Sequence, residues 1–211
     1  MSDHDDFAFE PIKGLPERLP AGEEILWQGK PNWMALARES LLLNWVIGYF
    51  LLLALWRFGV TYDTLTLDRA INGTVPFLVL GLLAAGLIML IAWIQARVTV
   101  YTITNARVVL RIGAALTLSL NLPFTKIEAA SLDQRKRGTG TIALQTTDKT
   151  KISYLVLWPH MRPWKMNPAQ PALRCIDDAQ SVARLLADAA DARLSQPQIE
   201  RQPLGDAVAA E

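Results

Sequence analysis

The sequence lacks most of the side chains that enzymes and metal centres require. Among its 211 residues there is one cysteine, Cys175, and two histidines, His4 and His160. A single cysteine excludes an intramolecular disulfide, and two histidines leave few ligands for a histidine-based metal site. There is no P-loop or HExxH motif, and Gly138-Thr139-Gly140 lacks the third glycine of a dinucleotide fingerprint. We therefore expect no catalytic site, no bound cofactor and no metal.

Ionisable side chains are also absent from residues 75–94. Twenty helical residues at about 1.5 Å each span roughly the 30 Å hydrocarbon core of a bilayer. Residues 41–56 are shorter and contain Asn44, yet they are dense in leucine and aromatic side chains. A buried core helix is the alternative for this second stretch, but its nearness to a clear span favours a hairpin. The sequence predicts transmembrane helices at about 41–56 and 75–94, joined by a loop over 57–74.

Small residues and flanking charges suggest how such a hairpin packs and is oriented. Gly81 and Ala85 form a small-xxx-small pair, which lets helices approach closely in lipid. The hairpin's own seam is favoured over a contact with another protein. Lys30, Arg38 and Arg97 flank the spans on the side of the two chain ends. This bias predicts a multi-pass protein with both termini in the cytoplasm.

The net charge of +1 conceals a segregation of charge along the chain. Residues 97–176 carry twelve Lys or Arg and three Asp or Glu, whereas residues 1–40 carry four and eight. Three interpretations of the basic side chains remain open: they belong to a solvated loop, they contact anionic lipid headgroups, or they contact an acidic protein surface. We expect lipid or protein partners and no nucleic acid. The candidate contact residues are Arg135, Lys136, Arg137, Arg162, Trp164 and Lys165.

The pattern changes to β-structure after residue 97. Segments 98–104, 107–112, 116–122, 127–132, 141–145 and 152–157 are predicted strands, because they are rich in β-branched residues or alternate in polarity. A third span over 108–122 is the alternative, but Arg111, Ser119 and Asn121 interrupt the apolar run, and its apolar and polar residues alternate with a period of two, as in a strand. Trp158 is expected to end a strand and fill the core. Residues 158–171 contain four prolines and are expected to form neither a regular helix nor a central strand.

An amphipathic helix is predicted from Asp177 to about Ala190, with a stripe of apolar residues that begins at Ile176. The predicted fold class is therefore α+β. An N-terminal segment (1–40) precedes the hairpin (41–96), and a small split β-barrel capped by the C-terminal helix (97–192) follows it. Residues 193–211 are expected to form a disordered tail.

Several short motifs share an order along the chain with one known family. They are Gly22–Pro31, Tyr101–Asn105, Arg107–Arg111, Gly113, Leu122–Pro123, Ile127 and Gly138–Ile142. In this order they resemble the bacterial pleckstrin-homology-like (PH-like) domain. The resemblance implies that the split barrel is PH-like and that a membrane part precedes it.

A second set of motifs narrows the resemblance. Phe7–Pro16, Arg111–Thr117, Leu157–His160, Arg162–Trp164 and Leu173–Cys175 look like the photosynthetic complex assembly proteins of purple phototrophic bacteria. The resemblance implies an assembly factor in the inner (cytoplasmic or intracytoplasmic) membrane. Its partners would be subunits of the reaction centre and core antenna, and it would act without a catalytic site and perhaps as a homodimer. The alternatives are a tethered module that binds anionic lipid headgroups and a protein of envelope stress or regulation.

Overall fold

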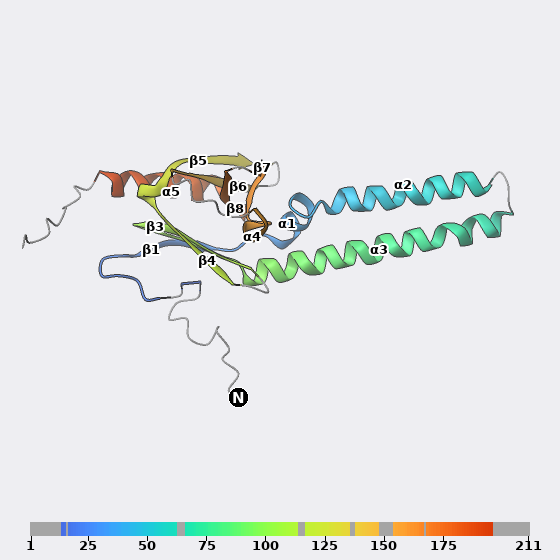
Figure 1. Cartoon of the computed structure of the whole chain (residues 1–211), viewed down its shortest axis with the longest axis horizontal. Helices are drawn as coiled ribbons and strands as arrows, with labels where there is room; N and C mark the ends of the chain where they lie inside the picture. Colours follow the sequence, from blue (N-terminus) through green and yellow to red (C-terminus); the bar gives the residue numbers. More distant parts are fainter. Residues whose placement is uncertain are drawn as a thin grey trace, which may run out of the picture.

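Two long helices project from one end of a β domain, so that the molecule is elongated (Figure 1). The computed structural model describes residues 14–15, 17–62, 66–113, 117–135, 138–147, 154–166 and 168–195. The two helices are α2 (Leu43–Tyr62) and α3 (Leu67–Val98), and the short helix α1 (Trp33–Glu39) precedes them.

The helices extend further than the apolar segments in the sequence. The loop expected over 57–74 is wrong, because α2 continues to Tyr62 and α3 begins at Leu67. Hydropathy marks the residues that suit lipid, whereas the helical hydrogen-bond ladder continues through polar residues. Thr61 and Thr74 satisfy their hydroxyls within the helices, since these donate to the carbonyls of Arg57 and Ala70 at 2.7 and 2.8 Å.

The first sheet has the strand order β1-β2-β3-β4 and is antiparallel throughout. Its strands are β1 (Ile25–Gly29), β2 (Val100–Thr104), β3 (Arg107–Ile112) and β4 (Leu118–Pro123). The predicted strands after residue 97 are therefore present here. β3 and β4 occupy residues 108–122 in place of a third span, and only α2 and α3 of the described residues are long and apolar enough to cross a membrane.

The N-terminal segment belongs to the β domain, although its strand lies before the hairpin in sequence. Glu23 forms a two-pronged ion pair with Arg107, at 2.7 Å to Nε and 2.9 Å to Nη2. The Thr104 hydroxyl donates to the same carboxylate at 2.8 Å. These bonds fix the start of β1 to the turn between β2 and β3. The expectation that residues 1–40 form a segment separate from the β domain is therefore corrected, because β1 is a strand of the first sheet.

The second sheet has the order β5-β6-β8-β7. Its strands are β5 (Ile127–Gln134), β6 (Thr139–Thr146), β7 (Met161–Met166) and β8 (Ala169–Asp177). Two expectations are wrong here. Residues 154–157 form a short helix, α4 (Tyr154–Leu157), in place of a strand, and Trp158 after it is 43% exposed and does not fill the core.

The proline-rich segment departs from expectation in part. It forms β7, which is an edge strand, but it also supplies the first three residues of β8, a central strand that was not expected there. Pro163 is tolerated because β7 lies at the edge of the sheet, where a missing backbone donor breaks no ladder bond. Pro171 lies in β8 beyond Ala172, the last residue that pairs with β6. Position within the sheet therefore decides the effect of each proline.

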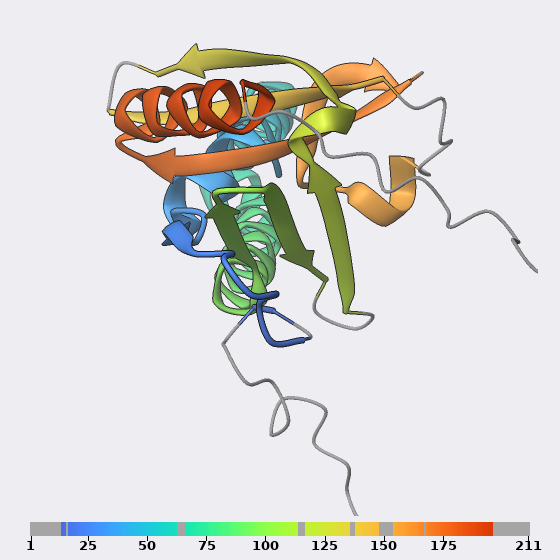
Figure 2. The ribbon, with the colours of Figure 1, turned by 90° about the vertical axis from the view of Figure 1, so that its left-hand side faces the viewer.

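The core lies between the two sheets and under the C-terminal helix α5 (Ala179–Leu194). The 3-10 turn η1 (Phe124–Lys126) leads from β4 directly into β5, and the described strands form two separate sheets, so the expected barrel is not closed. Figure 2 shows α5 lying against the second sheet. The fully buried large side chains are Tyr101, Phe124, Leu36, Ile103, Leu110, Ile112, Ile142, Leu144, Leu157, Met161, Leu173 and Ile176.

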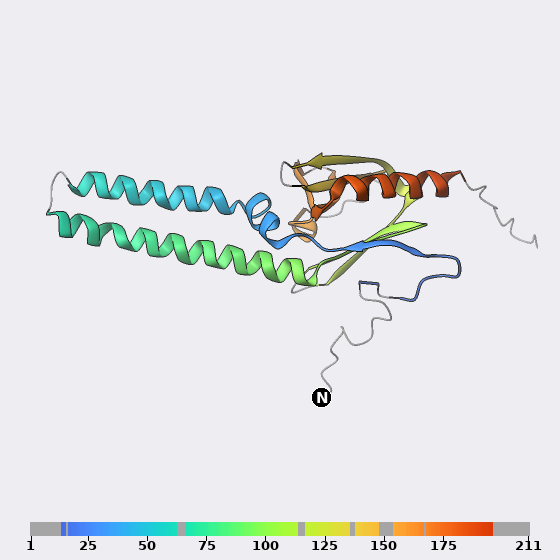
Figure 3. The same cartoon turned by 180° about the vertical axis from the view of Figure 1, so that it is seen from behind.

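The C-terminal helix starts two residues later than expected and ends four residues later. β8 continues to Asp177, because Ile176 and Asp177 pair with Gly140 and Thr139 of β6. Ile176 therefore enters the core from a strand and not from the apolar stripe of the helix. Of the predicted stripe, Ala179, Val182 and Leu186 are buried in the core, and Ala183 and Ala190 pack against it. Ala189, which was not predicted, is buried as well. Seen from behind, α5 runs along the length of the β domain, and its last turn lies at the end of the domain opposite the hairpin (Figure 3).

Candidate interaction site

A fully buried histidine lies where the hairpin joins the β domain. His160 follows α4, and its Nδ1 lies 2.6 Å from the hydroxyl of Tyr101 in β2. Its Nε2 lies 3.1 Å from the hydroxyl of Thr99, the residue that caps α3. The Tyr101 hydroxyl also accepts a bond from the Arg174 backbone N–H at 3.3 Å. This cluster connects the second sheet to the end of the second long helix.

Burial sets the protonation of the cluster. It lowers the pKa of His160 to about 3, and the nearby Arg174 guanidinium acts in the same direction. Burial also raises the pKa of the Tyr101 hydroxyl well above its usual range. Both groups are therefore neutral at neutral pH. A buried, neutral imidazole bonded on both nitrogens has a structural role and offers no exposed base for catalysis.

A second contact between the two parts is made by α1. Asn32 caps this helix by accepting from the backbone N–H of Met34 and Ala35, at 3.1 and 3.2 Å. Its own backbone N–H donates to the Cys175 carbonyl at 2.7 Å. The Cys175 thiol is directed at Glu39 (Sγ to Oε2, 3.8 Å). Burial is the main cause that raises the thiol pKa to about 12, and the negative charge of Glu39 acts in the same direction. Cys175 is therefore a buried, neutral thiol of the α1 contact.

A hollow of about 330 Å³ brings together three of the predicted contact residues. It is lined by residues of β5, β6, β7 and the loop after β5, and Arg135, Arg162 and Trp164 are among them. Trp164 is 89% exposed and has a φ of +62°, a conformation that is uncommon for bulky residues. An exposed indole held in this way on an edge strand is an unusual surface feature, which favours a contact function over core packing.

The cations of this hollow are partly paired within the chain. Arg135 lies 3.1 Å from the Asp133 carboxylate and 3.5 Å from Glu39 of α1. Arg162 donates to the Gln170 side chain at 3.2 Å. Lys165 follows Trp164 in β7 and is half-buried, outside the lining of the hollow. The remaining two candidates, Lys136 and Arg137, lie outside the described residues.

The structure places the small-residue pair at the seam of the hairpin itself. A Cβ atom added at Gly81 would lie 2.7 Å from Phe50 Cβ, so only glycine permits this approach of α3 to α2. Ala85 is buried in a cluster with Ala37 of α1 and Leu43 of α2. Only 11% and 17% of the most apolar parts of α2 and α3 are buried, so neither is a core helix of the domain.

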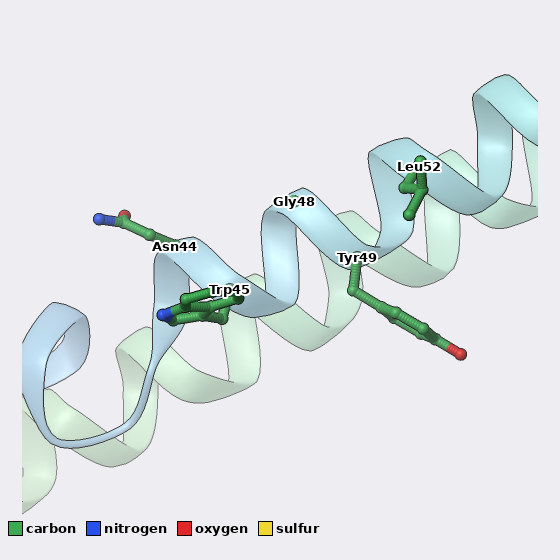
Figure 4. Close-up of a pocket in the computed structure, with 5 residues that line it drawn as sticks. All are labelled: Asn44, Trp45, Gly48, Tyr49 and Leu52. Atoms are coloured by element: carbon green, nitrogen blue, oxygen red, sulfur yellow. The ribbon is translucent and has the colours of Figure 1, made fainter.

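A shallow apolar notch lies on the outer face of α2. Gly48 forms its floor, and no heavy atom lies within 4 Å of the position that a Cβ would take. Figure 4 shows Trp45 and Tyr49 projecting beside this glycine, with Asn44 and Leu52 a turn away on either side. The notch has a volume of about 420 Å³, and Trp45 is 78% exposed. Its shape suits close packing of another helix against α2.

The comparisons with known proteins agree with this architecture. The family model described as bacterial PH domain matches residues 36–190. The chain belongs to this family. This match confirms the resemblance to PH-like domains, a family that is typically non-catalytic. Within the residues that the structure describes, no group of three His, Cys, Asp or Glu side chains could hold a metal ion.

Two individual proteins are similar to this chain. An uncharacterized 23.7 kDa protein of Rhodobacter capsulatus, named for its place in the puhA 5' region, is 47% identical over 212 residues. The match covers 100% of this chain and 99% of that protein. A solved structure of a DUF1696 family protein with a pleckstrin-homology domain, from Shewanella loihica, matches 44% of this chain and 70% of its own, at 10% identity and a TM-score of 0.30.

Sequence reasoning missed the two contacts that join the hairpin to the domain. Asn32 directly before the apolar run of α1 carries a recognisable N-cap signal, and it could have located that helix. His160 has no local signal, because its partners Thr99 and Tyr101 lie about sixty residues away in sequence. The proximity of Arg135 to Arg162 and Trp164 likewise depends on the pairing of β6 with β8 and of β8 with β7.

Proposed function

We propose that the chain is a membrane-anchored assembly factor for the photosynthetic reaction centre and core light-harvesting complex, of the PuhB type. It acts by binding subunits and not by catalysis. The observation that carries the proposal is the full-length, 47% identity to a protein named for the puhA 5' region, which is a photosynthesis gene region. Assembly is a function that a PH-like domain on a membrane hairpin can serve without a catalytic site.

In this proposal the hairpin resides in the inner membrane, and both chain ends lie on the cytoplasmic side. Arg97 at the end of α3 stacks over the Trp93 ring at 4.4 Å, an arrangement that suits the membrane interface. The notch over Gly48 packs against a helix of an unassembled subunit, and the β domain holds a cytoplasmic part of the same subunit. Release then follows from weaker binding of the assembled state, since a binding protein can shift an equilibrium only by differential affinity.

Deletion of the gene in a phototrophic host is expected to remove the near-infrared absorption bands of the reaction centre and core antenna from the membranes. The intact gene supplied in trans should restore the bands. The bands report assembled pigment complexes, so their selective loss reflects failed assembly. Absorption spectra of membranes from cells grown under phototrophic conditions provide the measurement. An unchanged spectrum with normal phototrophic growth contradicts the proposal and points to a role in envelope stress or regulation.

A second candidate function is the binding of anionic lipid headgroups, and the hollow around Trp164 favours it. Arg135 contacts α1 through Glu39, and α1 leads directly into α2. Arg135 therefore lies at the end of the domain from which the hairpin projects. Each Lys or Arg near an anionic membrane surface contributes about 1 kcal/mol to the free energy of membrane binding.

Substitution of Arg135, Lys136 and Arg137 by glutamine is expected to distinguish the two functions. If lipid binding is the function, three lost charges weaken phosphatidylglycerol retention roughly a hundredfold at low salt, at about 1 kcal/mol each. Native mass spectrometry of the detergent-solubilised full chain counts the retained lipids. The matched control replaces Lys126, Arg184 and Arg193, which lie on η1 and α5, by glutamine. Loss of a co-purifying subunit with unchanged lipid retention would instead support the assembly function.

A further inference from the structure

One edge of the second sheet is open. β5 is the outermost strand in the order β5-β6-β8-β7, and seven of its eight residues are exposed. Figure 2 shows β5 at the outer edge of the domain, alongside α5. After a bulge between Ile127 and Ala129, the residues Ala129–Gln134 pair with β6 without interruption. This stretch offers six residues of regular strand to an added chain.

The open strand is bordered by an apolar groove. A hollow of about 300 Å³ lies between β5 and α5. Leu132 of β5 is 40% exposed, and Leu194 at the end of α5 is 57% exposed. Between Leu132 and Leu194, α5 lines the groove with alanine side chains, which are too small to fill it. The apolar lining residues used here are Ile127, Leu132, Ala183, Ala187, Ala190 and Leu194.

The charge of the groove is of one sign. Glu128 and Asp191 line it from opposite sides, and no lysine or arginine is among its described lining residues. Glu128 also accepts a bond from Gln145 at 2.9 Å, which holds its carboxylate over β5. A groove with an open strand on one wall, a helix on the other and carboxylates on both complements an extended chain that carries apolar and basic side chains.

We propose that this groove binds an extended, basic peptide segment of a partner protein by strand addition. The segment pairs its backbone with Ala129–Gln134 of β5. Its apolar side chains lie between β5 and α5, and its lysine or arginine side chains face Glu128 and Asp191. This binding goes beyond the assembly function and does not depend on it, because it rests on the edge strand and the groove alone.

The test uses the full chain in nanodiscs of phosphatidylcholine, a lipid without net charge. The probe is a fluorescein-labelled decapeptide in which valine alternates with lysine. Fluorescence anisotropy is expected to show saturable binding. A peptide with glutamate at the lysine positions should bind at least tenfold more weakly, and one with proline at two valine positions should not bind.

Hydrogen exchange locates the binding. Amides of β5 should exchange more slowly when the valine–lysine peptide is present, whereas those of β7, the other edge strand, should not change. Ala187→Trp fills the groove and is expected to weaken binding at least tenfold. Ala192→Trp is the matched control, because Ala192 is an exposed α5 residue outside the groove lining. In the same way Asp191→Asn should weaken binding severalfold and Asp188→Asn should not.

Three results would overturn the proposal. The first is peptide binding without slower exchange in β5, and the second is equal binding to the Ala187→Trp and Ala192→Trp variants. The third is protection of β5 that rises with protein concentration in the absence of peptide, since this would assign the groove to a second copy of the chain. Loss of pigment complexes in the deletion strain is a separate result, so the two proposals fail independently.

Discussion

Substitution of Gly81 by leucine is expected to separate α2 from α3 and to destabilise the hairpin by about 1–3 kcal/mol, the usual range for an overpacked contact. The added Cβ would lie 2.7 Å from Cβ and 3.1 Å from Cγ of Phe50. Neither atom is the far end of a flexible chain, so the helices must move apart. Ala85, four residues along α3, would then lose its packing against Leu43.

A matched variant is available in the same helix. Gly86 also lies in α3, but nothing is within 4 Å of the position that its Cβ would take. Gly86→Leu should therefore behave like the parent protein. Thermal unfolding of the purified full chain in detergent measures the difference, and the protein content of membranes reports it in cells. Equal melting temperatures for the two variants would show that the seam does not depend on close helix contact.

The sequence predicted the parts of the fold that depend on local pattern. Strands β2 to β5 and the helix α5 follow from local pattern within a few residues. The two long helices follow from apolar composition, although α3 begins eight residues before the predicted span. The choice between strand and span over 108–122 also follows from local pattern, because Arg111, Ser119 and Asn121 interrupt the apolar run. In the structure Arg111 and Ser119 face each other in the β3–β4 ladder. Local pattern is informative wherever one face of an element is buried.

The parts that the sequence did not predict depend on distant partners. The prolines of residues 158–171 argue against a central strand, yet Pro171 lies in the central strand β8, beyond the last residue that pairs with β6. The expectation that Trp158 fills the core depends on a strand over 152–157. Residues 154–157 form a helix instead, and Leu157 is the buried residue. β1 could not be joined to the β domain because seventy residues of α1 and the hairpin separate it from β2.

The candidate sites show the same division. Gly81 and Ala85 were identified from spacing, and the structure shows which helix each one touches. Arg135, Arg162 and Trp164 were chosen separately by residue type, and only strand order reveals that they share one hollow. The groove between β5 and α5 has no sequence motif, because an edge strand is defined by the absence of a neighbour.

The junction cluster makes the stability of the protein sensitive to acid. The pKa of His160 is about 3 in the folded protein, below the value of about 6.5 for an unfolded chain. Between these values the unfolded state binds the proton and the folded state does not. The stabilisation is therefore complete above pH 6.5 and is lost progressively as the pH falls toward 3, by up to about 1.4 kcal/mol per pH unit.

Replacement of His160 by asparagine is expected to remove this acid sensitivity. Asparagine does not titrate, and its amide can still bond to the Tyr101 hydroxyl, although the bond to Thr99 is lost. The variant should therefore be less stable than the parent at pH 7, by about 1–3 kcal/mol for an unpaired buried group, and the difference should shrink as the pH falls to 4. Urea unfolding of the full chain in detergent at several pH values measures both effects.

The second histidine provides the control for this experiment. His4→Asn removes the other imidazole of the chain. If the acid sensitivity arises at the junction, the unfolding curve of this variant should follow that of the parent at every pH. Carboxylates that titrate over the same range are common to all three proteins and cancel in the differences. A constant gap between the parent and His160→Asn from pH 7 to 4 would mean that the imidazole binds its proton equally in the folded and unfolded states, with no lowered pKa in the fold. The neutral cluster between Thr99 and Tyr101 would then be the wrong description of the junction.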